Sequence, residues 1–218
     1  MKIDPQLLRL YAVTDRGHLN GRSLPDVVDE ILAGGVTIVQ LREKDMLLED
    51  FIREALAVKK VTDRWGVPLI INDNIQVCQA VSAAGVHVGQ SDMEAGQVRR
   101  LLGPEKIIGV TAKTVEQALA AQAAGADYLG CGAVFGSATK LDTKKMELDT
   151  LDDICRHVSI PVVAIGGISF ENISQLSGRL MDGVAAVSAL FSAGNPKKAA
   201  QDLREKIDSM YSSAGSAK

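Results

Sequence analysis

The stretch Ala124-Gly125-Ala126-Asp127, followed by Tyr-Leu-Gly-Cys-Gly at 128–132, carries the local pattern that decides the fold. A helical segment ends in small residues and glycine, and a short apolar run follows at once. Glycine after a helix supplies a left-handed cap, and such an apolar run is typical of a buried parallel strand. The stretch therefore predicts one helix-to-strand unit of an α/β protein.

The same pattern occurs at three further places, namely Ala33-Gly34-Gly35-Val36, Ala84-Gly85-Val86 and Met181-Asp182-Gly183-Val184. Extended outward, it predicts strands near 9–14, 36–41, 68–72, 85–89, 106–111, 127–131, 161–165 and 183–188, with helices between them. Eight alternating units favour a (β/α)8 TIM barrel. A doubly wound sheet is the competing fold, but it would leave two or three of these strands unassigned.

The boundaries of several helices can also be predicted. Helices are clearest from Leu48 to Trp65 and from Thr114 to Ala124, the second opening with a capping box between Thr114 and Gln117. A last helix is expected from Asn195 or Pro196 to about Tyr211. No linker divides the chain, so we expect one domain over 1–211 and a small, polar, disordered tail over 212–218.

Composition excludes several classes of protein. The 218 residues are 46% hydrophobic, and 24 basic against 27 acidic residues leave a net charge of −3. This balance, with few aromatic residues, argues against a nucleic-acid surface, and no apolar run is long enough to cross a membrane. The amino terminus becomes acidic too early for a signal peptide. Three cysteines without metal-binding spacing indicate reduced thiols and a cytoplasmic protein, while the oligomeric state is left open.

Polar residues gather where the predicted strands end, which is where a barrel of this type places its active site. Gln40 stands in an otherwise apolar strand, and Arg42 and Lys44 follow it. Strand alternation puts Gln40 and Arg42 on one face. A solvated charge run is the alternative for Arg42 to Lys44, but the buried Gln40 favours a site.

Two aspartates, Asp73 and Asp92, follow neighbouring strands. Carboxylates from adjacent loops suit Mg²⁺, which leaves its other positions to water and substrate phosphates. Helix capping explains such residues about equally well.

A long basic loop and a glycine turn predict phosphate binding. The loop from Gly132 to Glu147 contains Ser137, Thr139 and Lys140, and long loops on compact scaffolds are often functional. Gly166-Gly167 after the seventh strand and Ser188 after the eighth resemble the phosphate site common in barrels, although a tight turn would also need glycine. Two phosphorylated substrates, or one bisphosphate, would fit.

The histidines and Cys131 are interpreted as structural. His87 lies between two valines of a predicted strand, His18 is expected at the surface, and His157 is expected at the end of a helix away from the site. Cys131 has no identifiable base beside it, which favours the role of a small apolar residue.

Seven motifs of this chain resemble those of the thiamine-phosphate synthase family. They are YAVTD at 11–15, QLREK at 40–44, IINDN at 70–74, GVHVGQSD at 85–92, AGADYLGCGAVF at 124–135 with Thr139-Lys140, AIGGI at 164–168 and GVAAVSALF at 183–191. The resemblance covers nearly the whole chain. It implies a transferase that joins 4-amino-2-methyl-5-(diphosphooxymethyl)pyrimidine to 4-methyl-5-(2-phosphooxyethyl)thiazole, giving thiamine phosphate and diphosphate.

The resemblance also assigns residues. It implies that the pyrimidine diphosphate binds Gln40, Leu41, Arg42, Glu43, Lys44, Asn72, Thr111 and Lys140. It implies Mg²⁺ on Asp73 and Asp92, and thiazole phosphate on Ser137, Ala138, Thr139, Gly167, Val187 and Ser188. Arg42, Lys44 and Lys140 would stabilise the departing diphosphate, so that no histidine or cysteine base is required.

This chain departs from the family pattern in two places. Many members have Ser-x-His after the fifth strand, where this chain has Thr111-Ala112-Lys113, and the common Pro-Thr-x-Thr-Lys loop reads Gly136-Ser137-Ala138-Thr139-Lys140. We expect altered kinetics with the reaction retained. The alternatives are the related thiazole tautomerase, which uses a histidine where Lys113 stands, and a non-catalytic barrel that binds a phosphorylated ligand. The aspartate pair favours the synthase.

Overall fold

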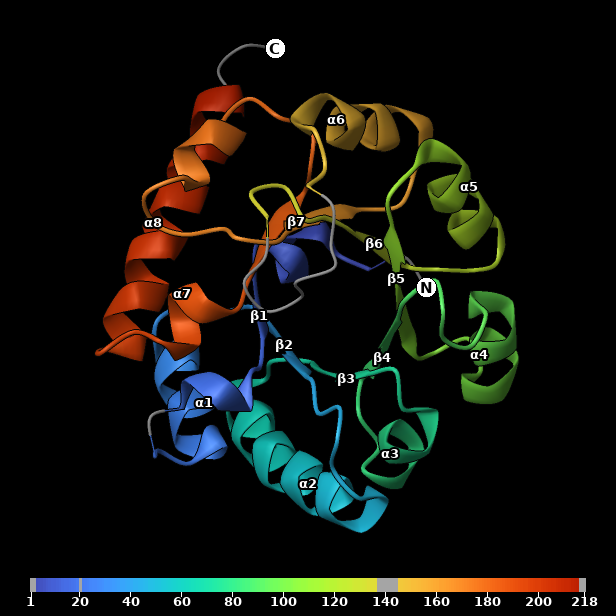
Figure 1. Ribbon diagram of the computed structural model, residues 1–218, viewed down its shortest axis with the longest axis vertical. Helices are drawn as coiled ribbons and strands as arrows, with labels where there is room; N and C mark the ends of the chain where they lie inside the picture. The colour runs from blue at the N-terminus through green and yellow to red at the C-terminus, as the bar shows by residue number, and fades with distance from the viewer. Residues whose placement is uncertain (1–2, 20, 137–144, 216–218) are drawn as a thin grey trace.

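Eight parallel strands close into a barrel in this computed structural model, which describes residues 3–19, 21–136 and 145–215 (Figure 1). The strands are β1 Leu10–Val13, β2 Ile38–Leu41, β3 Leu69–Asn72, β4 Gly85–Val88, β5 Ile107–Ala112, β6 Tyr128–Gly132, β7 Val162–Ile165 and β8 Gly183–Ala186. Each strand pairs with the next, and β1 also pairs with β8, with Tyr11 opposite both Ile38 and Ala185. The predicted (β/α)8 barrel is confirmed, and every strand end lies within two residues of its prediction.

The helices form a ring outside the barrel (Figure 1). The α-helices are α1 Leu24–Ala33, α2 Leu48–Trp65, α3 Ile75–Ala80, α4 Ala95–Leu102, α5 Val115–Ala123, α6 Leu148–His157, α7 Ser188–Phe191 and α8 Pro196–Gly215. The described residues also form the 3-10 turns η1 Pro5–Leu8, η2 Arg16–His18 and η3 Ile173–Leu176. The predicted limits of α2 are confirmed, and Thr114 caps α5 by accepting a hydrogen bond from the Gln117 backbone N–H.

The repeated glycines do two different things. Gly35 and Gly125 follow helices with φ of 99° and 92°, as the capping interpretation requires. Gly85 and Gly183 instead lie inside β4 and β8, where the capping interpretation is wrong. A Cβ at Gly183 would lie 1.8 Å from the Leu8 carbonyl oxygen, so this glycine lets two backbones approach closely.

Two helical predictions need correction. Only the 3-10 turn η3 lies between β7 and β8, where a helix was expected. The connection, residues 166–182, contains Gly178, whose φ of 77° lies outside the helical region and interrupts any long α-helix there. Helix α8 continues to Gly215 and does not end at Tyr211, because Ser212, Ser213 and Ala214 do not break a helix.

Apolar side chains pack in two layers, one on each face of the sheet. Alternate strand residues such as Leu10 and Ala12 pack outward against the helices. Tyr11, Val13 and Tyr128 point inward and fill the barrel with a smaller cluster. Side chains thus fill the barrel near the amino ends of the strands, and the open space lies toward their carboxyl ends.

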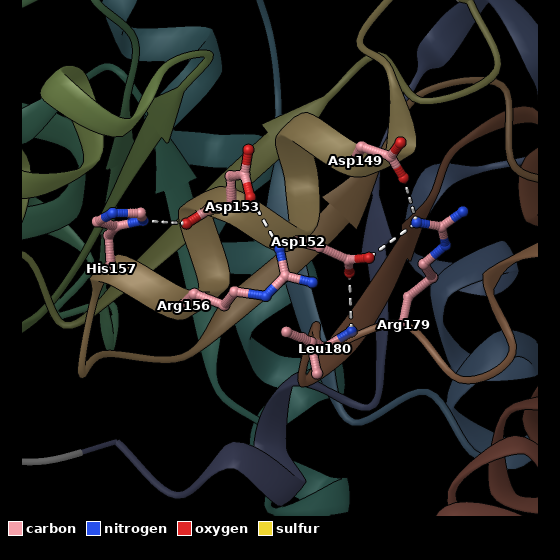
Figure 2. Close-up of polar contacts among 7 residues, drawn as sticks. All are labelled: Asp149, Asp152, Asp153, Arg156, His157, Arg179 and Leu180. Carbon is pink, nitrogen blue, oxygen red and sulfur yellow. Dashed lines mark hydrogen bonds and ion pairs between the residues drawn. The ribbon is translucent and has the colours of Figure 1, made fainter.

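A group of charged residues fastens α6 to the segment before β8 (Figure 2). We call Asp149, Asp152, Arg179 and Leu180 the α6 polar cluster. The Arg179 guanidinium lies 2.8 Å from a carboxylate oxygen of each aspartate, and Asp152 also accepts the Leu180 backbone N–H at 3.1 Å. Asp152 is buried, so the cluster holds two elements together at the outer layer.

Candidate active site

A cavity of about 220 Å³ opens where the strands end, and its walls differ in polarity. One wall comes from β2 to β5 and carries the polar side chains Gln40, Asn72, His87 and Thr111. The other comes from β1, β7 and β8 and carries apolar side chains, among them Val13, Val163, Ile165 and Ala185. Such a space can hold a flat ring that makes polar contacts along one side.

The structure brings seven of the predicted site residues to this cavity, namely Gln40, Arg42, Asn72, Thr111, Gly167, Val187 and Ser188. The Leu41 side chain does not face it, because it is fully buried in the layer between strands and helices. The predicted residues Ser137, Ala138, Thr139 and Lys140 lie outside the residues that the structure describes.

Glu43 and Lys44 line a second hollow on the rim, together with Arg42. Arg42 lines both spaces, so the two are neighbours. The Arg16 guanidinium of η2 pairs with Glu43 at 3.1 Å and with Glu54 of α2 at 3.3 Å. Arg16 thus balances the charge of Glu43, while Arg42 and Lys44 share the hollow with the carboxylates of Asp15, Asp45 and Asp50.

The two aspartates predicted to bind metal are both exposed beyond β3 and β4. Asp73 has a φ of 61° and accepts a hydrogen bond from the Asn72 side-chain amide. Asp92 accepts the Gly89 backbone N–H at 2.7 Å through one carboxylate oxygen. Among the described residues, no group of three or more His, Cys, Asp or Glu side chains could hold a metal ion. Mg²⁺ takes carboxylate oxygens and fills its other positions with water and substrate oxygens, so the chemistry of these two side chains is compatible with the predicted magnesium site.

The glycine turn after β7 packs against the segment that follows β6. Gly166 and Gly167 have φ of 106° and 65°. A Cβ at Gly167 would lie 2.7 Å from the Gly136 carbonyl oxygen, so a larger residue would push the two loops apart. Both glycines line the cavity beside Ser188, where the sequence predicted a phosphate.

Three side chains inside the barrel were not foreseen as parts of the site. Tyr11, Tyr128 and His87 all line the floor of the cavity, and the two tyrosines are almost completely buried. The tyrosine hydroxyls lie 2.7 Å apart, and the Tyr128 hydroxyl lies 3.0 Å from His87 Nδ1. The position of His87 between two outward-facing valines was the available signal, because alternation turns it inward.

The same contacts continue to predicted substrate residues at both ends. The Gln40 side-chain amide donates to the Tyr11 hydroxyl at 2.9 Å, and His87 Nε2 lies 3.0 Å from the Thr111 hydroxyl oxygen. We call Gln40, Tyr11, Tyr128, His87 and Thr111 the inner hydrogen-bond chain. Burial raises the pKa of Tyr11 and of Tyr128, so both hydroxyls keep their protons at neutral pH.

Lys113, one of the two departures from the family pattern, also lines the cavity. Its backbone N–H donates to the Gln117 side chain at 2.8 Å, which fixes the start of α5 behind it. A cation is therefore available just beyond β5, and Arg42 supplies another to the same cavity just beyond β2.

The cysteines and the remaining histidines stand away from any reactive arrangement. Burial raises the pKa of the Cys131 thiol to about 12 and that of the Cys78 thiol to about 11. Thiols of this kind are inert apolar residues. His157 lies in the last turn of α6, where its ring contacts the Asp153 carbonyl oxygen at 2.7 Å (Figure 2).

The closed parallel barrel, with a partly polar cavity at its strand ends, defines a (β/α)8-barrel protein whose cavity lies where this fold places its active site. The family described as thiamine monophosphate synthase matches residues 10–190. A thiamine-phosphate synthase of Ruminiclostridium cellulolyticum is 50% identical over 196 residues, covering 90% of this chain and 93% of the relative. One of Clostridium tetani is 45% identical over 194 residues, covering 89% and 93%. This chain belongs to the thiamine-phosphate synthase family, a family of transferases.

A solved structure agrees with this assignment. A thiamine phosphate pyrophosphorylase from Pyrococcus furiosus superposes with a TM-score of 0.87 at 33% identity, covering 94% of this chain and 98% of that one. The resemblance inferred from the sequence is therefore confirmed. No helix in the described part of the chain has the length and apolar character needed to cross a membrane.

Proposed function

We propose that this chain joins 4-amino-2-methyl-5-(diphosphooxymethyl)pyrimidine to 4-methyl-5-(2-phosphooxyethyl)thiazole, forming thiamine phosphate and releasing diphosphate. The observation that carries the proposal is the single cavity that collects predicted pyrimidine residues on one side and predicted thiazole-phosphate residues on the other. The curated relatives named as synthases support it across nine-tenths of the chain.

The reaction is a substitution at the pyrimidine methylene carbon. The bond from this carbon to the diphosphate oxygen breaks with its electron pair, and the thiazole nitrogen lone pair forms the new carbon–nitrogen bond. Arg42, Lys44 and Lys140 bind the departing diphosphate and stabilise its growing negative charge. Gln40, Asn72 and Thr111 hold the pyrimidine, while Gly167, Val187 and Ser188 hold the thiazole phosphate close enough for capture.

Asp73 and Asp92 would hold Mg²⁺ beside the diphosphate, where the ion supplies additional positive charge to the leaving group. The exposed carboxylates fit this role because each has one oxygen engaged in a hydrogen bond that fixes its orientation. Loss of either carboxylate would weaken metal binding without opening a cavity in the core.

The reaction is proposed to take place in the cytoplasm, with small molecules as the only partners. All three cysteines are free thiols, and two of them are buried. Free thiols of this kind are typical of a reducing compartment. The net charge of −3 offers no general attraction for nucleic acid or anionic membranes.

The decisive experiment supplies purified protein with both phosphorylated substrates, with and without Mg²⁺, and measures thiamine phosphate and diphosphate by chromatography. Magnesium-dependent formation of both products in equal amounts supports the proposal. A folded protein that makes neither product overturns it. A parallel incubation with the thiazole carboxylate tautomer alone distinguishes the related isomerase, which changes its substrate without releasing diphosphate.

A further inference from the structure

The inner hydrogen-bond chain links two predicted substrate residues through the floor of the barrel. Gln40 on β2 and Thr111 on β5 both line the cavity, and Tyr11, Tyr128 and His87 join them below it. Each of the four links is between 2.7 and 3.0 Å long. The inner hydrogen-bond chain is therefore continuous from Gln40 to Thr111, and both of these residues line the cavity where a ligand would bind.

The backbone is built to accommodate the chain. A Cβ at Gly109 would lie 2.2 Å from the Tyr128 ring and 2.5 Å from His87 Nδ1, and one at Gly130 would lie 3.0 Å from His87 Cε1. Glycine in a strand interior normally costs stability, so its presence at both places is explained by the room that the Tyr128 and His87 side chains need.

The direction of the hydrogen bonds can be worked out by counting protons from the Gln40 end. An amide nitrogen only donates, so the Tyr11 oxygen accepts from Gln40. The single proton of Tyr11 then has the Tyr128 oxygen as its acceptor, and the proton of Tyr128 has His87 Nδ1. A ring nitrogen that accepts carries no proton, so the His87 proton resides on Nε2 and is donated to Thr111.

The opposite direction leaves a proton without an acceptor. If Thr111 donated to His87, then Tyr128 would donate to Tyr11, whose oxygen would accept twice. The Tyr11 proton would then have no acceptor among the residues that the structure describes, inside a side chain that is 2% exposed. Leaving a buried donor unpaired is costly, so the first direction is favoured.

We propose that the inner hydrogen-bond chain fixes His87 as the Nε2–H tautomer, so that Thr111 accepts from His87 and presents its own hydroxyl proton to the ligand. Tyr11, Tyr128 and His87 are positioning residues that act through Gln40 and Thr111. At the other end, Gln40 keeps its carbonyl oxygen as an acceptor. The cavity therefore selects a ring with an acceptor atom at Thr111 and a donor group at Gln40.

An aminopyrimidine meets this requirement, because a ring nitrogen accepts and the exocyclic amino group donates. This last step rests on the proposed function, since it takes the pyrimidine as the ligand. The direction of donation along the inner hydrogen-bond chain does not depend on the proposed function, and it can be measured in the protein without substrate.

The first test reads the tautomer directly. Nitrogen-15 spectra of the imidazole rings, with His87 assigned by its absence in His87→Gln, should show the proton on Nε2 at a single pH. The Tyr128→Phe variant removes the donor to Nδ1 and should give a mixture of tautomers. Tyr11→Phe leaves the Tyr128 hydroxyl able to donate to His87 Nδ1, so His87 should remain in the Nε2–H form. A proton found mainly on Nδ1 in the unaltered protein overturns the proposal, whatever the variants do.

The second test reads binding. Tyr128→Phe should raise the KM for the pyrimidine diphosphate about tenfold and change kcat by less than about threefold, because its effect is on ligand positioning. Thr111→Val should give a similar rise, and Thr111→Ser should restore most of the affinity. Tyr211→Phe is the matched control, because it loses a partly buried tyrosine hydrogen bond to the Met181 carbonyl oxygen outside the cavity and should change neither quantity.

The two tests separate the possible failures. If the unaltered protein makes no thiamine phosphate but His87 carries its proton on Nε2, the proposed function is wrong. The inferred direction of the inner hydrogen-bond chain is then still supported. If a folded Tyr128→Phe variant keeps both the tautomer and the KM of the unaltered protein, the positioning role is wrong.

Discussion

The inner hydrogen-bond chain and the α6 polar cluster each contain buried polar side chains, although in the cluster Asp152 alone is buried, and the two differ in composition and in what they face. The inner hydrogen-bond chain joins hydroxyl, amide and imidazole groups, and both its ends line the cavity. The α6 polar cluster joins two carboxylates and a guanidinium to the Leu180 backbone (Figure 2). Its residues line neither the cavity nor the rim hollow. Burial of polar groups therefore does not mark a functional site, whereas a link from buried groups to an open cavity does.

The two regions should respond differently to substitution. Damage to the inner chain is expected to change ligand binding as well as stability. Damage to the α6 polar cluster is expected to change stability alone. The predictions below test this division, beginning with the largest effect.

Gly109→Ala should disrupt the inner chain most severely. The new methyl group would overlap the Tyr128 ring and His87, so we expect a loss of about 3 kcal/mol in the free energy of unfolding. Denaturant unfolding measures this loss, and a kcat/KM assay should show a parallel decrease. Gly194→Ala is the control, because nothing lies within 4 Å of its Cβ position and stability should hold. Full stability of Gly109→Ala would mean that the packing around Tyr128 is looser than described.

Asp92→Asn should impair turnover without weakening the fold. The amide oxygen can still accept the Gly89 N–H, so the loop is retained while a metal-binding charge is lost. We expect kcat/KM to fall about 100-fold at a fixed Mg²⁺ concentration, or about 2.7 kcal/mol in barrier height. Asp202→Asn on α8 controls for loss of a carboxylate elsewhere. If Asp92→Asn keeps the full rate at every Mg²⁺ concentration, the assignment of Asp92 to the metal is wrong.

Asp152→Ala should weaken the α6 polar cluster and spare the chemistry. The Leu180 N–H loses its acceptor and Arg179 loses one of two carboxylates, so we expect the free energy of unfolding to fall by about 2 kcal/mol. Asp153→Ala, on the same helix, removes only an exposed pair with Arg156 and should change stability by less than about 0.5 kcal/mol. A change in KM with Asp152→Ala would contradict the division between the two regions.

Lys113→Ala should have the smallest effect, because this cation lines the cavity but is exposed and lies outside the inner chain. We expect kcat/KM to fall about threefold at low salt, with the difference shrinking at high ionic strength. Lys113→Arg should retain the rate. An equal loss in both variants, independent of salt, would point to a role other than charge.

The sequence predicted the fold well because its signals are local. Small residues and glycine before an apolar run locate four of the strands, and alternation correctly turned Gln40 and Arg42 toward the cavity. Prediction from the sequence failed where a glycine serves close contact between backbones, as at Gly183, since that requirement comes from a segment distant in sequence, here Leu8 at the end of η1.

The inner chain could not be predicted for a similar reason. The Tyr11 and Tyr128 hydroxyls meet across 117 positions of sequence, and His87 joins them from a third strand. These contacts depend on the stagger of the strands in the closed barrel, which no local pattern encodes. Motif resemblance therefore pointed to residues at the rim, and the groups beneath them became visible only in three dimensions.

The pairing of β1 with β8 has a consequence for the synthesis of the protein. During synthesis β1 can pair with β2 early, but its other edge stays unpaired until β8 has been made. Until then the growing sheet has two open edges. Open edges are sites of aggregation, and contacts so distant in sequence form slowly. The barrel is thus a structure that closes late, and a nascent chain halted before β8 would be exposed to mispairing and proteolysis.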